Sequence, residues 1–366
     1  MLIGIDASRA NLKEKTGVEW YGYHLICGLA KLDTKNRYRL YTWEPLRDGL
    51  AKLPDNFEEV VIPNGRFWAY FALSNELRKN KVDRLFIPSH IVPPIHPEHT
   101  IVTIHDLGFR HFPESYSKYH YQNLNWGTRL STKWARTITV PSQAVAKDVQ
   151  AYYKIPSGKI VEIPNGYDAD MFKGLTPQKV AAVMKHHGVT DPYVLFLGRL
   201  EARKNVVRLL EAFYRLRDSG LFGGQLVLAG NPGIGYERIR DMIAKRKGQN
   251  YVVHTGYVGN EERAALLRGA RAFAFPSLFE GFGVPILEAF AAETPVLTSN
   301  RGATAEVAGD GALLVNPESV SEIHHGLEKL LADKGLVAKL VPRGKERLKR
   351  YGWAKSAKQI HAVLTE

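Results

Sequence analysis

The sequence is poor in cysteine, with Cys27 the only one among 366 residues. A single thiol excludes an internal disulfide and a zinc cluster built from cysteines, and it fits a reducing compartment. No apolar run is as long as a membrane span. The first ten residues, MLIGIDASRA, lack a basic region followed by a long apolar run. We therefore expect no signal peptide and a cytoplasmic protein.

Two ligand motifs are missing as well. The segment IGIDAS, at the end of the first expected strand, has no Gly-x-Gly-x-x-Gly turn, and this disfavours a dinucleotide oxidoreductase. No Asp-x-Asp metal signature stands in a plausible place, so we expect no metal in the site.

Acidic residues are fewer than basic ones, which leaves a net charge of +13. Such a charge favours an anionic partner, whether a nucleotide, a lipid surface or a nucleic acid. The densest basic stretch, residues 237–250, is typical of a helix with a solvated face. No recognisable nucleic-acid module accompanies it, so we expect no nucleic-acid partner.

Short apolar strands alternate with amphipathic helices along the chain, and this pattern predicts parallel sheets joined by helical crossovers. The length favours two domains. We expect an α/β protein with domains over residues 1–172 and 173–345 and a C-terminal helix over 346–366 that packs back across the first domain. The strand candidates are 1–8, 38–43, 82–89, 99–106, 136–142, 160–163, 193–200, 224–230, 251–257, 271–277, 294–299 and 311–315.

Two glutamates, Glu280 and Glu288, flank a glycine-rich turn in FPSLFEGFGVPILEAF. Glu280 follows a buried strand, at the edge where parallel sheets bind ligands. The glycines let a ligand approach main-chain N–H groups, and Pro285 suits the first turn of a helix whose N-terminus favours an anion. Carboxylates beside an anion site match a nucleotide sugar. The alternative is a Glu288 that complements the helix dipole and a solvated Glu280.

The segment FLGRLEARKNVVRLLEAF places Arg199, Arg203 and Lys204 in a loop after another strand, with Asn205 expected to cap the next helix. Cations at this edge would neutralise a diphosphate and stabilise the charge that develops when a nucleoside diphosphate leaves. The alternative is a set of ordinary surface cations.

The segments GRLEARKN, 254–317 and GWAKSAKQIHAVL resemble the retaining glycosyltransferases of family 4. The resemblance implies the GT-B fold, in which two Rossmann-like domains with parallel sheets face each other across a cleft. It also implies a metal-independent hexosyltransferase that uses a nucleoside diphosphate sugar as donor and no cofactor. The similarity is strongest over residues 190–366 and is greatest to bacterial or archaeal mannosyl- and rhamnosyltransferases, which favours GDP-mannose as donor.

The resemblance assigns roles in the second half of the chain. Glu280 would contact the donor sugar and Glu288 the ribose hydroxyls, while Arg199 and Lys204 would bind the diphosphate. Further donor-binding positions that it implies are Gly17, Gly198, Tyr257, Val258, Phe282, Gly283 and Val284.

In the first half, the resemblance implies that His105 reaches the transferred sugar and that Asp106 either orients His105 or acts as a base. Simple packing is the alternative for this histidine. The catalytic residues that we expect are His105, Asp106, Arg199, Lys204 and Glu280, and the acceptor or cleft residues are Glu19, Trp20, Asn165 and Asp168. Glu293 departs from the family, because relatives usually carry glycine there.

The expected reaction is the transfer of a hexose to a glycan or lipid-linked acceptor with retention of configuration. A GT-B nucleotide-sugar epimerase and a non-catalytic sugar- or nucleotide-binding protein remain as alternatives. Residues 115–137 mix tyrosine, tryptophan, lysine and arginine. They form either a helix that touches anionic lipid at the inner face of the membrane or an aromatic-rich helix that packs inside the first domain.

Overall fold

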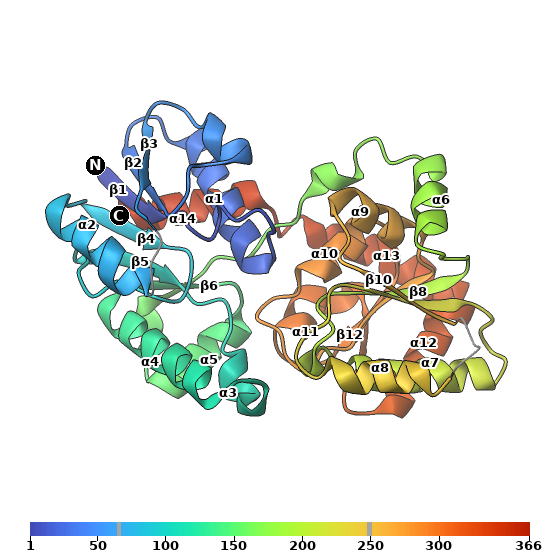
Figure 1. Ribbon diagram of the computed structural model, residues 1–366. Coiled ribbons are helices and arrows are strands. Elements are labelled where there is room, and N and C mark those ends of the chain that lie inside the picture. The colour runs from blue at the N-terminus through green and yellow to red at the C-terminus, as the bar shows by residue number, and fades with distance from the viewer. Residues whose placement is uncertain (64–66, 247–250) are drawn as a thin grey trace. The chain divides into compact units, whose positions relative to one another are not determined.

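The computed structural model describes residues 1–63, 67–246 and 251–366, and within them the chain divides into two compact units. The first unit combines Met1–Gly166 with Tyr351–Glu366, and the second is Tyr167–Arg350. Each unit contains one parallel sheet packed against helices (Figure 1). The predicted α/β class with two parallel sheets is therefore confirmed.

The two sheets share one strand order. Among the described residues, the first sheet runs β3-β2-β1-β4-β5-β6-β7 and the second runs β10-β9-β8-β11-β12-β13. Six strands of each follow the 3-2-1-4-5-6 order of a Rossmann fold, in which ligands bind beyond the carboxyl ends of the strands. The strands are β1 Leu2–Asp6, β2 Arg37–Thr42, β3 Phe57–Val61, β4 Arg84–Ile87, β5 His99–Thr103, β6 Thr137–Val140, β7 Ile160–Glu162, β8 Tyr193–Leu197, β9 Gln225–Ala229, β10 Val252–Gly256, β11 Ala272–Phe275, β12 Val296–Ser299 and β13 Leu313–Val315.

The helices fill the connections between strands. They are α1 Gly17–Leu32, α2 Ser74–Lys79, α3 Gly108–His111, α4 Lys118–Trp134, α5 Gln143–Tyr153, α6 Pro177–His186, α7 Val206–Asp218, α8 Tyr236–Ala244, α9 Asn260–Gly269, α10 Val284–Ala291, α11 Gly302–Ala308, α12 Val320–Ala332, α13 Lys334–Leu348 and α14 Trp353–Thr365. The helix predicted in the basic stretch is present as α8, while residues 247–250 of that stretch lie outside the described part of the chain.

The sequence pattern missed β3, which lies at one edge of the first sheet. Its residues FEEVV are exposed or half-buried, because an edge strand has a neighbour on one side only. The central strands, by contrast, are short apolar runs that are buried on both faces, as in β8. The signal of a strand thus fades toward the sheet edge.

Helix α14 belongs to the first unit, where it packs on α1 (Figure 1). The two helices approach so closely that a Cβ at Gly28 would lie 2.5 Å from Cβ of Ala357. The Ser356 hydroxyl donates a hydrogen bond of 2.5 Å to the Pro164 carbonyl. The Trp353 ring stacks on His24, with 4.7 Å between the ring centroids. The predicted return of the C-terminal helix to the first domain is confirmed.

The residues at the helix N-termini agree in part with those predicted from the sequence. Ser142 accepts a hydrogen bond from the backbone N–H of Val145 at the start of α5, and Pro285 stands in the first turn of α10, both as expected. Asn205 differs from the expectation. It precedes α7 with a left-handed backbone, φ 64°, and its side chain makes no cap.

Candidate active site

The Asn205 side chain ties together three loops at the carboxyl edge of the second sheet. Its Nδ2 donates to the carbonyl of Pro276, at 3.0 Å, and to that of Pro317, at 2.6 Å. These prolines follow β11 and β13, whereas Asn205 follows β8. Because all three loops leave the same edge of a parallel sheet, the amide fixes their spacing without contributing charge.

An ion-pair network joins the loops after β8 and β11. Lys204 Nζ lies 2.5 Å from Glu280 Oε1, and Arg203 Nη1 lies 3.4 Å from Glu280 Oε2. Arg203 Nε also pairs with Glu201 at 2.9 Å, and Arg199 Nε lies 3.7 Å from the other oxygen of that carboxylate. Three cations and two carboxylates therefore form one connected group, and it includes the predicted residues Arg199, Lys204 and Glu280.

Burial differs sharply within this network. The side chains of Lys204 and Glu280 are 12% and 9% exposed, whereas that of Arg199 is 57% exposed. Burial lowers the pKa of Lys204, and the Glu280 carboxylate opposes that change. A buried ammonium is costly unless it is paired, so Glu280 maintains the charge on Lys204. Arg199 presents its guanidinium to solvent beside this pair.

Glycines let the backbone of the same loops come close together. Gly198 and Gly230, which follow β8 and β9, have φ of 141° and 146°. A Cβ on Gly230 would lie 2.1 Å from the Gly198 carbonyl oxygen. Gly283, just before α10, has φ 113°, a conformation that side chains rarely adopt. The predicted glycine turn is thus a real conformational requirement, and Phe282 beside it is buried.

Glu288 lies in α10 and is buried beside a cation that the sequence pattern did not indicate. Its Oε1 is 3.1 Å from Arg263 Nη2, at the start of α9. Burial raises the pKa of Glu288; Arg263 opposes this rise and Asp168 adds to it. The carboxylate is thus held by Arg263, while the nearby Asp168 disfavours its negative charge. Tyr257 and Val258 precede α9, with Tyr257 54% exposed and Val258 buried.

His105 follows β5 in the first unit and is buried, with 7% exposed. Its Nε2 donates a hydrogen bond of 2.7 Å to the Pro88 carbonyl, and its ring meets Tyr21 edge-on, with centroids 4.8 Å apart. Burial lowers the pKa of His105, and this hydrogen bond opposes the change. The imidazole is therefore neutral at neutral pH. Asp106 accepts a hydrogen bond of 2.8 Å from the Gly108 N–H.

His90 is a second histidine near this edge, which sequence reasoning missed, and it is half-buried. Its ring centroid lies 6.0 Å from that of His105, and its Nδ1 is buried with no hydrogen-bond partner among the described residues. Burial and the neighbouring His105 lower the pKa of His90 to about 4. Two neutral imidazoles thus lie together near the carboxyl edge of the first sheet.

The start of α1 contains three more predicted positions. Glu19 accepts hydrogen bonds from the N–H and hydroxyl of Thr16, and its other oxygen lies 3.3 Å from Arg9. Trp20 stacks on His24, with 5.4 Å between centroids. Gly17 is exposed, and a Cβ there would meet no atom within 4 Å. Packing of the first unit therefore does not require glycine at this position.

The two remaining predicted residues lie on either side of the boundary between the units. Asn165 is buried in the first unit, and its Oδ1 has no hydrogen-bond partner within the part of the chain that the structure describes. Asp168, in the second unit, accepts a hydrogen bond of 3.0 Å from the Asp170 N–H and starts a short 3-10 turn. The residues predicted for the site are thus divided between the two units.

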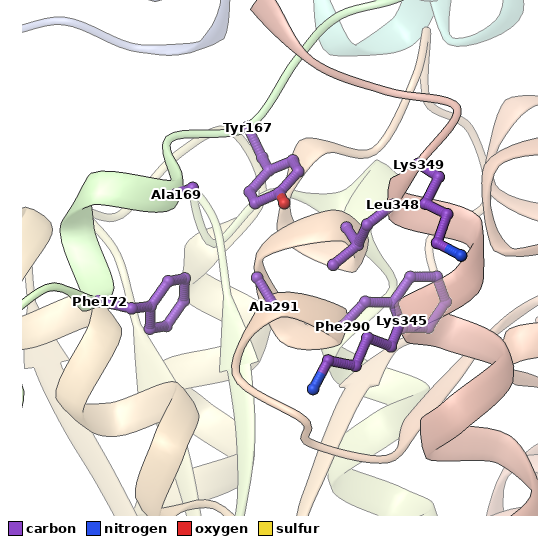
Figure 2. A pocket seen from close by; sticks show the side chains of 8 residues that line it. All are labelled: Tyr167, Ala169, Phe172, Phe290, Ala291, Lys345, Leu348 and Lys349. Atoms are coloured by element: carbon purple, nitrogen blue, oxygen red, sulfur yellow. The ribbon is translucent and has the colours of Figure 1, made fainter.

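A cavity of about 350 Å³ lies close to Asp168 in the sequence but contains none of the predicted residues (Figure 2). Aromatic rings and two lysines of α13 and its end line it. The lining residues are Tyr167, Ala169, Phe172, Phe290, Ala291, Lys345, Leu348 and Lys349. It is formed wholly within the second unit.

Arg263 and His90 are site residues that sequence reasoning did not select, and the pairing of the loop cation Arg203 with Glu280 was not predicted either. Arg203 stands next to Lys204 in sequence, but its partner Glu280 is 77 residues away. Arg263 and Glu288 meet across two helices. Such long-range pairs leave no local signal. The sequence signal available for His90 was its position shortly after the apolar strand β4.

Both halves of the chain match models of known protein families. Residues 16–171 match the family model described as Glycosyltransferase Family 4, and residues 183–347 match Glycosyl transferases group 1. The chain is 24% identical over 353 residues to O-antigen chain mannosyltransferase B of Escherichia coli, and the match covers 92% of this chain and 93% of that protein.

Solved structures show the same architecture. WaaG, a glycosyltransferase involved in lipopolysaccharide biosynthesis, superposes with a TM-score of 0.77 at 16% identity and covers all of both chains. Anabaena HepE in complex with UDP-glucose has a TM-score of 0.75 at 17% identity, over 100% of this chain and 99% of that one. The fold is therefore GT-B, and the chain belongs to the glycosyltransferases of family 4.

Proposed function

We propose that this glycosyltransferase transfers mannose from GDP-mannose to a glycan or lipid-linked saccharide with retention of anomeric configuration. The observation that carries the proposal is the network in which Lys204 and Arg203 hold Glu280 at the carboxyl edge of the second sheet, with Arg199 exposed beside it. The name of the related O-antigen mannosyltransferase supports mannose as the sugar. The UDP-glucose bound to HepE supports a nucleotide sugar as the donor class.

Lys204 and Arg199 would neutralise the diphosphate in this mechanism. The leaving group gains negative charge as the sugar departs, and preorganised cations stabilise that charge without solvent reorganisation. Main-chain N–H groups at the start of α10 would add to the effect, because a helix N-terminus favours anions. Since protein cations supply this charge, turnover is expected to continue in the presence of a chelator.

Glu280 and Glu288 would hold hydroxyl groups. Glu280 would accept hydrogen bonds from the donor sugar, and the buried Glu288, oriented by Arg263, would accept them from the ribose. Retention does not require Glu280 to attack the sugar. When the departing phosphate deprotonates the acceptor on the same face, the new bond forms where the old one breaks, and configuration is kept.

His105 would act as a neutral hydrogen-bonding group toward the transferred sugar. Its Nε2–H is already committed to the Pro88 carbonyl, which fixes the ring, and its lowered pKa keeps the imidazole uncharged. Asp106, placed next to it in the chain, would accept a hydrogen bond from the acceptor hydroxyl and orient it, while the departing phosphate takes the proton. Replacement of His105 by alanine should therefore lower turnover more than it lowers donor affinity.

A donor screen tests this proposal. The purified protein is incubated with GDP-mannose, UDP-glucose or GDP-rhamnose in a chelator, with and without saccharide acceptors, and nucleotide release is measured. We expect release that is greatest for GDP-mannose and depends on acceptor, with NMR showing an α-linked product from the α-configured donor. Sugar released or isomerised without acceptor would indicate an epimerase, and binding without release would indicate a non-catalytic protein.

The proposal also includes a peripheral contact between the outer face of α4 and an anionic membrane. Its inner face packs tightly, since a Cβ on Gly127 would lie 2.4 Å from Ile91. On its outer face, Tyr119 and Trp126 are 65% and 56% exposed, and the Arg129 guanidinium lies 5.7 Å from the Trp126 ring centroid. Exposed aromatics beside cations suit a lipid headgroup region. Among the described residues, no helix is long and apolar enough to cross a bilayer.

Vesicle sedimentation tests this contact. The protein should sediment with vesicles that contain phosphatidylglycerol and much less with pure phosphatidylcholine. Arg129→Glu should reduce sedimentation, whereas the same charge change at exposed Arg240, in α8 of the second unit, should not. Equal effects of the two substitutions would assign binding to net charge alone and remove α4 from the proposal.

A further inference from the structure

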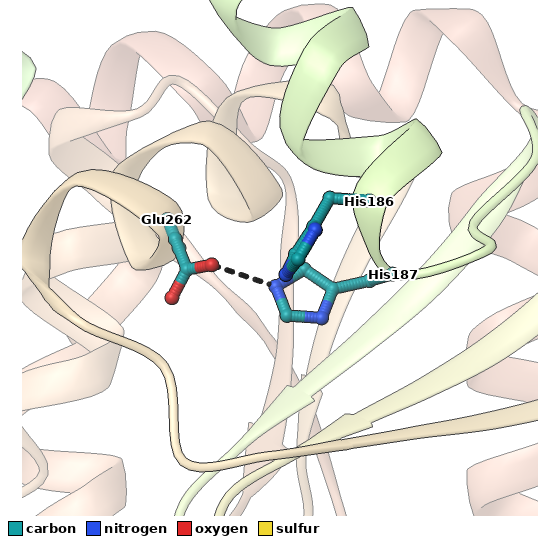
Figure 3. Close-up of side chains that lie close together, drawn as sticks. All are labelled: His186, His187 and Glu262. Atoms are coloured by element: carbon teal, nitrogen blue, oxygen red, sulfur yellow. Dashed lines mark hydrogen bonds and ion pairs between the residues drawn. The ribbon is translucent and has the colours of Figure 1, made fainter.

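Two adjacent histidines at the end of α6 lie opposite a glutamate at the start of α9 (Figure 3). His187 Nε2 is 3.0 Å from Glu262 Oε1, and the rings of His186 and His187 are 4.8 Å apart between centroids. One nitrogen from each histidine and one carboxylate oxygen all lie within 4.8 Å of one another. Three side chains with metal-binding atoms therefore converge from two helices.

We propose that His186, His187 and Glu262 bind a divalent transition metal, with Zn²⁺ as the cation that fits best, and that the metal clamps α6 to α9. Imidazole nitrogen and carboxylate oxygen are common zinc ligands. Tetrahedral ligands at about 2.1 Å from zinc are about 3.4 Å apart. The three ligand atoms here lie within 4.8 Å of one another, so a small movement brings them to zinc-binding distances. His186 is exposed, so rotation of its side chain closes the site. Water occupies the fourth position.

The surroundings of Glu262 preset the site. Its Oε2 accepts a hydrogen bond of 3.2 Å from the Gly259 N–H, which caps α9, so Oε1 faces His187. The other end of α9 already packs on α6, since a Cβ on Gly269 would lie 3.1 Å from Val180. Ligands whose orientation is fixed by neighbouring hydrogen bonds bind metals more tightly than mobile ones. The two helices are therefore held in register before the metal arrives.

A second cluster within the described residues provides an internal comparison. His324, His325 and Glu328 also place three ligand atoms within 4.8 Å of one another, but all three stand on the single helix α12. His324 Nδ1 donates to the Ala212 carbonyl at 3.3 Å, so that nitrogen is occupied. A metal there would join residues no more than four positions apart, whereas His187 and Glu262 are 75 positions apart. Of these two clusters, therefore, only the α6–α9 cluster links two separate helices.

Metal binding at the α6–α9 cluster should stabilise the folded chain by mass action, because unfolding separates its ligands. The experiment uses full-length protein without a histidine tag. Zn²⁺ is titrated in competition with a chromophoric chelator, Co²⁺ absorption reports ligand geometry, and thermal unfolding is followed with and without Zn²⁺. We expect one tight site per chain and a rise in melting temperature of about 5 °C when Zn²⁺ is about 100 times its Kd.

Two matched substitutions of exposed histidines locate the site. His186→Ala should weaken Zn²⁺ binding about 10-fold or more and reduce the rise in melting temperature to about half or less at the same Zn²⁺ concentration, while His325→Ala should leave both unchanged. Without metal, both variants should melt close to the wild type. The proposal is overturned if His186→Ala keeps the zinc response, if only His325→Ala loses it, or if the wild type binds no Zn²⁺. None of these measurements involves glycosyl transfer, so they are independent of the proposed function.

Discussion

The two sheets share a strand order, but the residues at their carboxyl edges differ in chemistry. In the second unit, Lys204 and Arg203 are paired with Glu280 in a mostly buried network. In the first unit, the half-buried His90 and the buried His105 lie close together, and burial lowers the pKa of both so that the imidazoles are neutral. One topology thus supports an edge with a cation–carboxylate network and an edge with a pair of neutral imidazoles. The task of each edge comes from a few loop residues rather than from the fold.

The comparison suggests a division of labour. A charged edge suits a diphosphate, whose own charge needs partners, and the pair of Lys204 with Glu280 keeps that charge available without leaving an unpaired buried ion. The neutral imidazoles of the other edge suit sugar hydroxyls, which need hydrogen-bond donors and acceptors but no net charge. Each of the following substitutions alters one side of this comparison, and they are ordered from the largest expected effect to the smallest.

Lys204→Ala should remove a cation from the diphosphate site and lower turnover about 100-fold or more, as expected for loss of one preorganised group that stabilises developing charge. Arg203→Ala is the matched control, because it also deprives Glu280 of a partner but is not assigned to the diphosphate. We expect Arg203→Ala to lose less than about 10-fold. Steady-state kinetics with a fixed acceptor, together with melting temperatures, separate the two roles. Equal losses of turnover would assign Lys204 to the support of Glu280 only.

The sequence predicted the edge of the second sheet better than that of the first. The loop after β8 and the glycine turn before α10 have strong local signals, and the position of both at one sheet edge follows from strand alternation. The pairing of Glu280 with Arg203, and of Glu288 with Arg263, depends on contacts between residues far apart in the chain. Local patterns contain no information on such contacts.

The histidines of the first unit show a different limit of sequence reasoning. The prediction of His105 rests on the family resemblance and on the aspartate that follows it, yet the atom that holds its ring is the Pro88 carbonyl oxygen. A backbone oxygen is present at every residue, so no sequence pattern distinguishes this one. The sheet edge β3 was missed for a related reason, since its exposed charged residues conceal its role as a strand. Features defined by neighbours in space require the structure.

His90→Gln should reduce the sensitivity of the first unit to acid. Unfolded histidine has a pKa near 6.5, and the folded value is about 4. Above pH 6.5 both states are neutral and the histidine has no effect. Below it the unfolded state gains a proton first, so the free energy of unfolding falls by about 3 kcal/mol as the pH drops to 4. The Gln variant should lack this loss.

Denaturant unfolding at pH 7 and pH 4.5, followed by a signal from the first unit, measures this difference. His325→Gln, which changes an exposed histidine of the second unit, is the control and should behave like the wild type. If wild type and His90→Gln lose the same stability between the two pH values, His90 is not held neutral, and the contrast between the two edges is weaker than we propose.

Gly17→Ala tests whether Gly17 is needed for the approach of the donor or for the packing of the first unit. A Cβ at Gly17 meets no atom within 4 Å, so the melting temperature should stay unchanged. If the donor phosphate approaches this backbone, the methyl group should reduce kcat/KM for the donor by about 10-fold, equivalent to about 1.4 kcal/mol. Gly283→Ala is the contrasting case, because its φ of 113° should make the substitution reduce stability as well. Full activity of Gly17→Ala would place this glycine outside the donor site.

Glu293→Gly should give the smallest effect and mark where the charged edge ends. Glu293 follows α10 with φ 60°, a left-handed conformation that costs a side-chain-bearing residue about 1 kcal/mol. Its ion pair with Lys345 is 3.0 Å long and exposed, and such pairs contribute little. Glycine should therefore raise the free energy of unfolding by about 0.5 kcal/mol. Lys345→Ala measures the ion pair alone, and a net loss of stability in Glu293→Gly would show that the pair outweighs the strain. Turnover should not change, because Glu288, within α10, is the last carboxylate assigned to the donor.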